Sequence, residues 1–310
     1  MLVKVVLGTR GSELARTQAH LVADAIRSFH PRVAVHTKII TTKGDEAKIV
    51  DPLEGRKGLF TANIERTLFT EEVDVAVHSA KDLPSGPSLG AKIAAVLPRA
   101  AIDDVLVSKH RCGLACLPGA AVVATGSVRR KHQLHWQRAD LNVIDLRGNV
   151  PTRLRKLAQN NWDAIVLARA GLERLGFLRT HTEIDFEGRQ FFLEVLPHRI
   201  FLPAGGQGII ALQIRANDQS TRALLDPVND RDTLLCLEAE REFLRGLHGD
   251  CNFPVGVLAT ISDGKMKMHA QLFEAGSQAP REAEVGGSFD AGETLAAQLL
   301  RMIRQDREQG

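Results

Sequence analysis

The sequence predicts an α/β protein made of two α/β lobes and a smaller α+β domain at the C-terminal end. Strand-like apolar runs alternate with amphipathic helical stretches from residue 3 to about residue 214, which is typical of mainly parallel, doubly wound sheets. From about residue 228 the order changes to helix, paired strands and helix. At 310 residues the chain is too long for one small core, so we expect two or three domains.

The first lobe is predicted to begin with a strand at residues 3–7 and a helix at residues 13–27, which Ser12 is placed to cap. Residues 43–58 are charged, contain glycine and lack a clear period, which is typical of a mobile loop over a site. One further helix, at 61–69, lies among the strands expected at residues 33–40, 73–79 and 91–97.

The second lobe repeats this alternation, and Pro151 lies where it favours the first turn of a helix. Its strands are expected at residues 121–127 and 163–168, a strand and turn at 141–149, and its helices at 128–136 and 151–158. A Pro/Gly segment and a strand follow within residues 202–214. The tail is predicted to hold a helix, strands at residues 255–261 and 265–273 that meet at a D-G turn, and a helix at residues 292–304.

The overall charge does not indicate a nucleic-acid or membrane protein. The 40 Lys and Arg residues nearly balance the 37 Asp and Glu residues, so the placement of basic residues matters more than their number. The N-terminal stretch is strand-like and lacks the apolar core and cleavage site of a signal peptide. No apolar run reaches the roughly 18 residues that a membrane span needs. We therefore expect a cytoplasmic protein with reduced cysteines.

Four cysteines are present, and only one lies in a setting that suggests chemistry. Cys112 and Cys116 have His110 nearby, but no second ligand pair follows, so we predict no metal site. Cys251 lies on a glycine-flanked turn in L-H-G-D-C-N-F-P-V-G, residues 247–256, where a thiol is exposed enough to react. The alternative, an idle buried cysteine, is open on these residues alone.

Cations follow nearly every predicted strand, at the edge where ligands bind in α/β sheets. They are accompanied by Ser79 and Ser127, and the set comprises Arg10, Lys81, Arg129, Arg130, Arg147, Arg153 and Arg174. Arg129 and Arg130 lie in the first turn of a predicted helix, where the helix dipole disfavours cations unless an anion is bound. The sequence therefore predicts a ligand with several carboxylates or phosphates.

One carboxylate, Asp82, lies among these cations. A structural salt bridge would account for it, and so would a role as catalytic acid or base or in stabilising a positive charge. The residues alone leave both open.

Nine motifs, in order, resemble the porphobilinogen deaminase (hydroxymethylbilane synthase) family. They are T-R-G-S-E-L-A (9–15), T-K-G-D (42–45), G-R-K-G-L-F (55–60), H-S-A-K-D-L-P (78–84), S-V-R-R (127–130), L-R-G-N-V-P-T-R-L (146–154), A-G-L-E-R-L-G (170–176), G-G-Q-G (205–208) and G-D-C-N-F-P-V-G (249–256). Each motif alone is weak, but nine at family spacing, running through nearly the whole chain, are specific.

The resemblance implies a transferase of tetrapyrrole biosynthesis with three domains. Two lobes like those of periplasmic binding proteins would enclose a cleft, with domain 1 at residues 1–98 and 203–226, domain 2 at 99–202 and domain 3 at 227–310. Hinges are expected near residues 98–102 and 203–208, because the growing chain requires domain motion. The enzyme would join four porphobilinogen units head to tail, with loss of ammonia, into hydroxymethylbilane.

The resemblance also implies the site residues. Cys251 would hold a dipyrromethane cofactor through a thioether, and Asp82 would assist departure of the amino group and stabilise the charge on the pyrrole. Cofactor binding is further expected of Ser79, Lys81, Asp82, Thr125, Ser127, Arg129, Arg130, Arg147 and Gly148. Substrate binding is expected of Arg10, Ser12, Arg147, Asn149, Arg153, Arg174 and Gln207.

The sequence departs from the family pattern at two positions near these residues. Position 126 is Gly where Ser is usual, and Asp250 precedes the cysteine where a small residue is usual. A carboxylate at position 250 would raise the pKa of the Cys251 thiol and slow attachment of the cofactor.

Two other classes of function compete with the enzyme as explanations of these residues. A non-catalytic two-lobed binding protein for a polycarboxylate ligand is compatible with the fold, but it gives Cys251 no role. A nucleic-acid binder is disfavoured by the near-neutral net charge of +3. We expect a monomer whose small-molecule substrate is porphobilinogen, with no nucleic-acid partner and no membrane partner.

Overall fold

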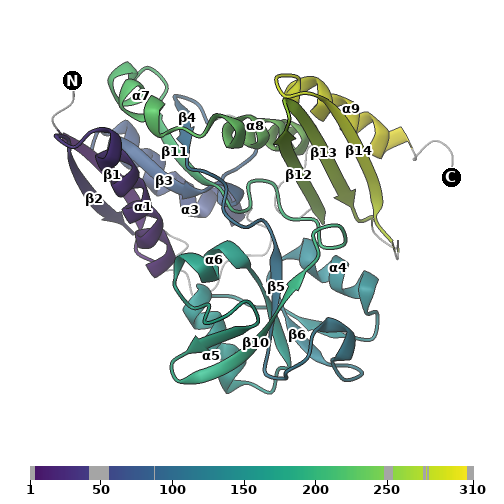
Figure 1. Ribbon diagram of the computed structural model, residues 1–310. Helices are drawn as coiled ribbons and strands as arrows, with labels where there is room; N and C mark the ends of the chain where they lie inside the picture. The colour runs from purple at the N-terminus through teal and green to yellow at the C-terminus, as the bar shows by residue number, and fades with distance from the viewer. Residues whose placement is uncertain are drawn as a thin grey trace.

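The computed structural model describes residues 4–41, 56–86, 88–247, 254–274, 277 and 279–305. These residues form two α/β lobes and a third domain with its own sheet, as the sequence predicts (Figure 1). Cys251, Asp250 and most of the loop expected at 43–58 lie outside the described residues. No helix within the described ranges is long and apolar enough to cross a membrane.

The first lobe is built on a five-stranded sheet with the order β2-β1-β3-β11-β4. Its strands are β1 (Lys4–Arg10), β2 (Ala34–Ile40), β3 (Val75–Ser79), β4 (Ala91–Val96) and β11 (Ile210–Arg215). Its helices are α1 (Glu13–Phe29), α3 (Arg56–Phe69) and α7 (Gln219–Leu225), and η1 (Ala80–Asp82) and η3 (Asp226–Val228) are single 3-10 turns. One apolar cluster joins α1 to the sheet, and another lies under α3.

Helix α1 begins and ends where its sequence dictates. The Ser12 hydroxyl accepts a hydrogen bond from the Ala15 amide at 3.3 Å, which confirms the predicted cap. Val22 and Ile26 lie on one face of the helix and are fully buried against the sheet. The capped end of α1 therefore lies at the carboxyl end of β1, where Arg10 also lies.

The second lobe contains a six-stranded sheet with the order β7-β6-β8-β5-β10-β9. Its strands are β5 (Asp104–Ser108), β6 (Val122–Ala124), β7 (Asn142–Ile144), β8 (Ala164–Ala168), β9 (Glu183–Phe186) and β10 (Arg189–Leu196). Its helical segments are α4 (Val128–Gln137), α5 (Val150–Gln159), α6 (Arg169–Arg174) and the 3-10 turn η2 (Leu114–Cys116). Figure 1 shows this lobe below the other two domains.

Both lobe sheets are mixed, although the sequence predicts mainly parallel pairing. Parallel pairs join β1 to β2 and β3, and β6 to β7 and β8. Strand β11 returns from the second lobe and enters the first sheet antiparallel to β3 and β4. Strand β5 arrives from the first lobe and likewise pairs antiparallel with β8. The two crossings between the lobes therefore bring β11 and β5 into the sheets antiparallel to their neighbours, and the β9–β10 hairpin adds a further antiparallel pair to the second sheet.

The third domain packs two helices on one antiparallel sheet. Its elements are α8 (Arg231–Gly246), β12 (Val255–Ser262), β13 (Lys265–Leu272), β14 (Arg281–Ser288) and α9 (Gly292–Gln305). The D-G turn between β12 and β13 places Asp263 and Gly264 at positive φ, as expected for a tight hairpin. Phe243 and Leu299 are fully buried between the helices and the sheet.

Two of the four cysteines are paired, which differs from the expectation of reduced thiols. Turn η2 brings the Cα atoms of Cys112 and Cys116 to 5.7 Å, and the two sulfurs form a disulfide. Cys236 is free and buried in α8.

Asp104 links the second lobe to the segments in which the chain crosses between the lobes, residues 99–104 and 202–209. Its fully buried carboxylate accepts hydrogen bonds from Arg129 at 2.9 Å, Arg130 at 2.7 Å and Gln207 at 2.9 Å. Arg129 also donates to the Leu202 carbonyl at 2.7 Å. Burial alone would raise the pKa of Asp104, but the two guanidinium charges outweigh it and hold the pKa well below its usual range. This ion pair therefore fixes α4 and the returning segment, residues 202–209 ahead of β11, to the first residue of β5.

Glu240 of α8 joins the third domain to the same crossing. Its buried carboxylate accepts hydrogen bonds from Arg99 at 2.7 Å, from the Gly206 amide at 2.7 Å and from the Ala259 amide at 2.8 Å. Arg99 also donates to the Gln207 carbonyl at 2.9 Å. All three domains thus meet around residues 99–104 and 202–208.

Replacing Asp104 with Ala should lower the free energy of unfolding by about 3–5 kcal/mol, because two guanidinium ions are then buried without their counter-charge. The pKa of Asp104 is depressed in the folded state, so its contribution is complete above the unfolded-state value of about 3.9 and is lost as pH falls below it. Urea unfolding followed by circular dichroism measures both effects.

Asp140→Ala is the matched control, because Asp140 pairs with Arg138 at the exposed surface. It should cost far less stability than Asp104→Ala. Equal losses in the two variants would contradict the special importance of the buried ion pair.

Candidate active site

A cavity of about 640 Å³ lies between the two lobes. It is lined from the first lobe by the β1–α1 and β3–η1 connections, and from the second by the β6–α4, β7–α5 and β8–α6 connections. These connections all follow the carboxyl ends of strands, where ligands bind in α/β sheets. The returning segment contributes Gly206, Gly208 and Ile209 to the lining.

Six cationic side chains from both lobes line this cavity, and the sequence predicts all of them. They are Arg10, Lys81, Arg130, Arg147, Arg153 and Arg174. Ser12, Ser79, Gly148 and Asn149, which the sequence also predicts, lie in the same lining. Such a concentration of positive charge in a concave site favours a ligand with several anionic groups.

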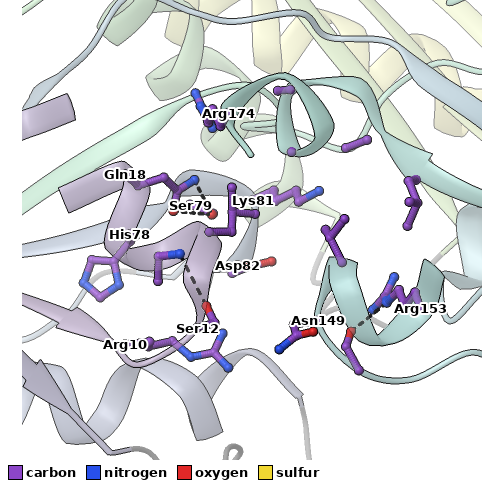
Figure 2. A pocket seen from close by; sticks show the side chains of 18 of the residues that line it. Arg10, Ser12, Gln18, His78, Ser79, Lys81, Asp82, Asn149, Arg153 and Arg174 are labelled. Atoms are coloured by element: carbon purple, nitrogen blue, oxygen red, sulfur yellow. Dashed lines mark hydrogen bonds between the residues drawn. The ribbon is translucent and has the colours of Figure 1, made fainter. Parts of the chain in front are cut away.

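Asp82 is the sole acidic residue among the described residues that line the cavity. It ends the short turn η1, and its side chain is exposed to the cavity. Figure 2 shows its carboxylate between the first-lobe residues and Asn149 of the second lobe. Asp82 forms no hydrogen bond or ion pair with a described residue. The alternative that Asp82 forms a structural salt bridge therefore has no support among the described residues. The carboxylate is therefore available to exchange a proton or to face a positive charge.

Lys81 lies beside Asp82, and its ammonium group forms no hydrogen bond within the described part of the chain (Figure 2). Burial, followed by the charge of Arg130, lowers its pKa to about 8, although Asp82 and Asp104 act in the opposite direction. At neutral pH the group is mostly protonated and lacks a counter-ion hydrogen bond. It is suited to an anionic ligand group.

Arg130 faces the cavity from the first turn of α4. Its terminal nitrogens donate to Asp104 and to the Val166 carbonyl at 3.0 Å. Its Nε–H is buried and has no hydrogen-bond partner among the described residues. Ser127 caps the helix by accepting from the Arg130 amide at 3.4 Å. The bonds to Asp104 and Val166 use two of the five N–H donors of Arg130 and hold the side chain in place, so donors remain for a ligand.

The second lobe presents its other cations from helix starts and strand ends. Asn149 caps α5 by accepting from the Thr152 amide at 2.9 Å. Gly148 precedes it at φ +118°, and a Cβ there would lie 2.7 Å from the Thr152 side chain, so only glycine fits the turn. Arg153 donates to the Gly148 carbonyl at 2.7 Å, which holds its side chain in the lining of the cavity.

Arg174 reaches across to the returning segment. It donates to the Gly208 carbonyl at 2.6 Å, and burial lowers its pKa while leaving it protonated at neutral pH. Gly208 lies at φ +86°, and a Cβ there would lie 2.5 Å from the Ala100 carbonyl oxygen. A cavity cation of the second lobe thus contacts the segment that leads back into the first lobe.

Four of the residues expected to bind cofactor or substrate do not line the cavity. Thr125 accepts a hydrogen bond from the Ser127 amide at 3.3 Å, and both act in the turn before α4. Arg129 and Gln207 are buried, with their side chains turned to Asp104. The anion that the first-turn arginines of α4 require is therefore supplied largely by Asp104 itself. A direct contact from these four side chains to a ligand has no support in their placement.

Sequence reasoning missed several polar residues of the lining, chiefly Gln18, Thr61 and His78. Gln18 is buried on α1 and donates to the Ser79 hydroxyl at 2.9 Å (Figure 2). A glutamine on the buried face of α1 was a usable signal, because such a residue needs a hydrogen-bond partner. Thr61 is also buried, and the sequence offered no comparable signal for it.

Comparison with known proteins places the chain among one group of enzymes. The protein-family model described as porphobilinogen deaminase, dipyromethane cofactor binding domain, matches residues 5–223. The family model for the C-terminal domain of porphobilinogen deaminase matches residues 234–301. The porphobilinogen deaminase of Syntrophomonas wolfei is 42% identical, over 95% of this chain and 94% of its own length. That of Roseiflexus sp. is 40% identical, over 96% of this chain and 95% of its own length.

Among solved structures, a TRAP periplasmic solute binding protein from Desulfovibrio salexigens is similar to the chain with a TM-score of 0.42 and 10% identity. The similarity covers 79% of this chain and 76% of that protein.

The affinity of the cavity for a polycarboxylate such as pyromellitate should fall above about pH 8, by up to tenfold per pH unit, as Lys81 loses its proton. Lys81→Arg should keep its affinity over the same range, because a guanidinium stays charged. Isothermal titration calorimetry at a series of pH values measures the difference. Identical pH profiles for the two proteins would show that Lys81 does not bind the anion.

Proposed function

The chain belongs to the porphobilinogen deaminase family, and we propose that it joins porphobilinogen units at Asp82, in the cavity between the lobes, on a dipyrromethane held by Cys251. The family reaction condenses four porphobilinogen units into hydroxymethylbilane with loss of ammonia, and this chain is a transferase of that kind. Dipyrromethane is its cofactor. No observation favours the alternative of a non-catalytic binding protein.

The observation that carries the proposal is one unpaired carboxylate inside a cavity lined by six cations. Each porphobilinogen unit is one pyrrole ring with an acetate and a propionate group. A growing chain of such units therefore needs many fixed cations. Arg10 and Lys81 are supplied by one lobe, and Arg130, Arg147, Arg153 and Arg174 by the other. A polycarboxylate ligand can therefore be held from both sides.

The residues of the cavity fit the cofactor. Arg130 has a buried Nε–H that lacks a partner among the described residues, and the Lys81 ammonium is close enough to feel its charge. These donors would hold carboxylates of the dipyrromethane, together with Arg147, which also lines the cavity. When bound, the dipyrromethane supplies the pyrrole carbon to which the first substrate unit is joined.

The described flanks of the Cys251 loop support its assignment. Helix α8 ends at Gly246 on one side of the loop, and Pro254 lies just ahead of β12 on the other side. The Val257 amide donates to the Pro203 carbonyl at 3.0 Å, next to the returning segment that lines the cavity. Only Asn252 and Phe253 lie between Cys251 and Pro254 in the sequence, so the proposal assigns the thioether to a loop that leads directly into this part of the third domain.

Asp82 carries the proton chemistry in this proposal. Asp82 would stay hydrogen-bonded to the substrate amine, which leaves as ammonia, and its carboxylate would then face the cationic pyrrole that remains. When the new C–C bond forms, the pyrrole carbon of the growing chain loses a proton, which Asp82 would accept and return to the amine of the next substrate unit or to solvent. The surrounding arginines hold the substrate carboxylates and cannot themselves accept a proton. One carboxylate can serve every cycle, because it returns to the same state after each addition.

Chain growth requires room beyond the present cavity of about 640 Å³. We place the hinges at residues 98–102 and 203–208 and the domains at residues 1–98 with 203–226, 99–202 and 227–310. Glycines at positive φ, Gly206 and Gly208, lie in the second hinge, and Arg174 contacts it directly. We further propose that the enzyme works as a cytoplasmic monomer, with porphobilinogen as its substrate and no nucleic-acid partner.

Cys251→Ala should abolish both the mass increment of the bound dipyrromethane and the consumption of porphobilinogen. Cys236→Ala is the matched control, because burial raises the pKa of the Cys236 thiol to about 12 and leaves it unreactive. Intact-protein mass spectrometry and a porphobilinogen assay measure the two properties. A wild-type protein with only its sequence mass would overturn the proposal.

Asp82→Asn should keep the mass increment and lower kcat by at least about a hundredfold, because the amide cannot transfer a proton. Asp140→Asn, a surface change away from the cavity, should keep the wild-type rate. Steady-state kinetics on proteins of verified mass tests both. Turnover of Asp82→Asn within a few-fold of wild type would remove its assigned role.

A further inference from the structure

His78 is a polar residue of the cavity wall that the mechanism above does not use. It lies near the end of β3, on the face of the sheet that α3 covers, and only 6% of it is exposed. Figure 2 shows it on the same side of the cavity as Arg10 and Ser12. Each of the two ring nitrogens of a buried histidine is a hydrogen-bond donor or acceptor, so each is expected to have a partner.

A chain of hydrogen bonds fixes one of these nitrogens. His78 Nε2 lies 3.1 Å from Oε1 of Gln213 in β11. Gln213 in turn donates from Nε2 to Glu65 of α3 at 2.8 Å. The Ser88 hydroxyl donates to the same Glu65 oxygen at 2.7 Å.

The Glu65 carboxylate, at the far end of this chain of hydrogen bonds, determines which ring nitrogen of His78 carries the proton. The Glu65 carboxylate oxygen accepts this hydrogen bond, so the amide of Gln213 turns its NH₂ toward Glu65 and its oxygen toward His78. The Gln213 oxygen also only accepts, so His78 Nε2 must carry a hydrogen. In the neutral ring Nδ1 is then unprotonated and presents a lone pair.

The ring is neutral under working conditions. Burial lowers the pKa of His78 to about 4, and the charge of Arg10 acts in the same direction. Glu65, Asp82 and the hydrogen bond to Gln213 act in the opposite direction without outweighing burial. His78 Nδ1 forms no hydrogen bond with any residue that the structure describes. It is therefore a neutral acceptor in a wall otherwise rich in cationic donors.

Such an acceptor matters for the proposed substrate, and this step rests on the proposed function. Each pyrrole ring carries an N–H donor, and porphobilinogen also carries an ammonium group. The cationic side chains of the cavity can only donate, so they cannot satisfy these groups. Asp82 can accept, but during turnover it is engaged with the leaving amine and the charge that follows.

We propose that His78 positions the substrate by accepting a hydrogen bond at Nδ1 from one of its N–H groups, while Gln213 and Glu65 hold the ring in the required tautomer. The donor is either a pyrrole N–H or the ammonium, and the experiment separates these two.

His78→Phe in the holoenzyme keeps a planar ring but has no acceptor. Loss of one neutral hydrogen bond should raise KM for porphobilinogen about three- to tenfold, with kcat changed less than about twofold. His30→Phe is the matched control in the same lobe, since His30 bonds the Leu224 carbonyl at 2.9 Å and does not line the cavity. It should leave KM unchanged. A purely structural role for His78 would lower Tm of His78→Phe without raising KM, and that result would overturn the proposal.

The ring nitrogens can also be observed without any substitution. Nitrogen-15 NMR of the wild-type holoenzyme with labelled histidine should show the His78 ring with Nε2 protonated and Nδ1 unprotonated at neutral pH. Saturating porphobilinogen should shift the Nδ1 signal. A hydrogen on Nδ1, or no shift on binding, would overturn the proposal even if His78→Phe fails to fold.

A substrate analogue with hydroxymethyl in place of aminomethyl keeps the pyrrole N–H and lacks the ammonium. If the KM penalty of His78→Phe persists with this analogue, the pyrrole N–H is the donor; if it disappears, the ammonium is. Consumption of porphobilinogen by the wild type tests the proposed function separately. An active wild type with no KM penalty in His78→Phe would reject only the role of His78.

Discussion

The buried carboxylate of Asp104, held between the guanidinium groups of Arg129 and Arg130, is the interaction on which the arrangement of the site depends. It is the first residue of β5, so it stands where the chain enters the second lobe. Through Gln207 it also holds the segment where the chain leaves that lobe. The same contacts hold Arg130 in place at the cavity wall. The Asp104 ion pair therefore both stabilises the second lobe and sets the position of a cation in the cavity.

Local chemistry made the outline of the fold predictable. The Ser12 cap, the first-turn Pro151 and the D-G turn each depend on residues close in sequence, and the structure contains all three. Strand β5 was missed because D-V-L-V-S follows a segment that reads as a hinge. The antiparallel pairing of β5 and β11 was also missed, because it depends on where the chain crosses between lobes rather than on any local period.

The site was predictable as a set of charges but not residue by residue. Arg129 and Arg130 are neighbours in one motif, yet only Arg130 lines the cavity, because successive helical residues face different directions. Asp82 was identified, whereas the tautomer of His78 depends on Gln213, 135 residues away. Contacts of this range are set by tertiary packing, which a single sequence does not display.

The position of β11 has a consequence for synthesis on the ribosome. This strand lies between β3 and β4, but it is translated after the whole second lobe. Until residue 215 emerges, β3 and β4 have no partner on their facing edges, while all strands of the second lobe are already available. The second lobe can therefore fold first, and the earlier-made lobe closes its sheet only when that strand arrives. Nascent chains that stop short of β11 expose two unpaired strand edges, which are sites for aggregation or chaperone capture.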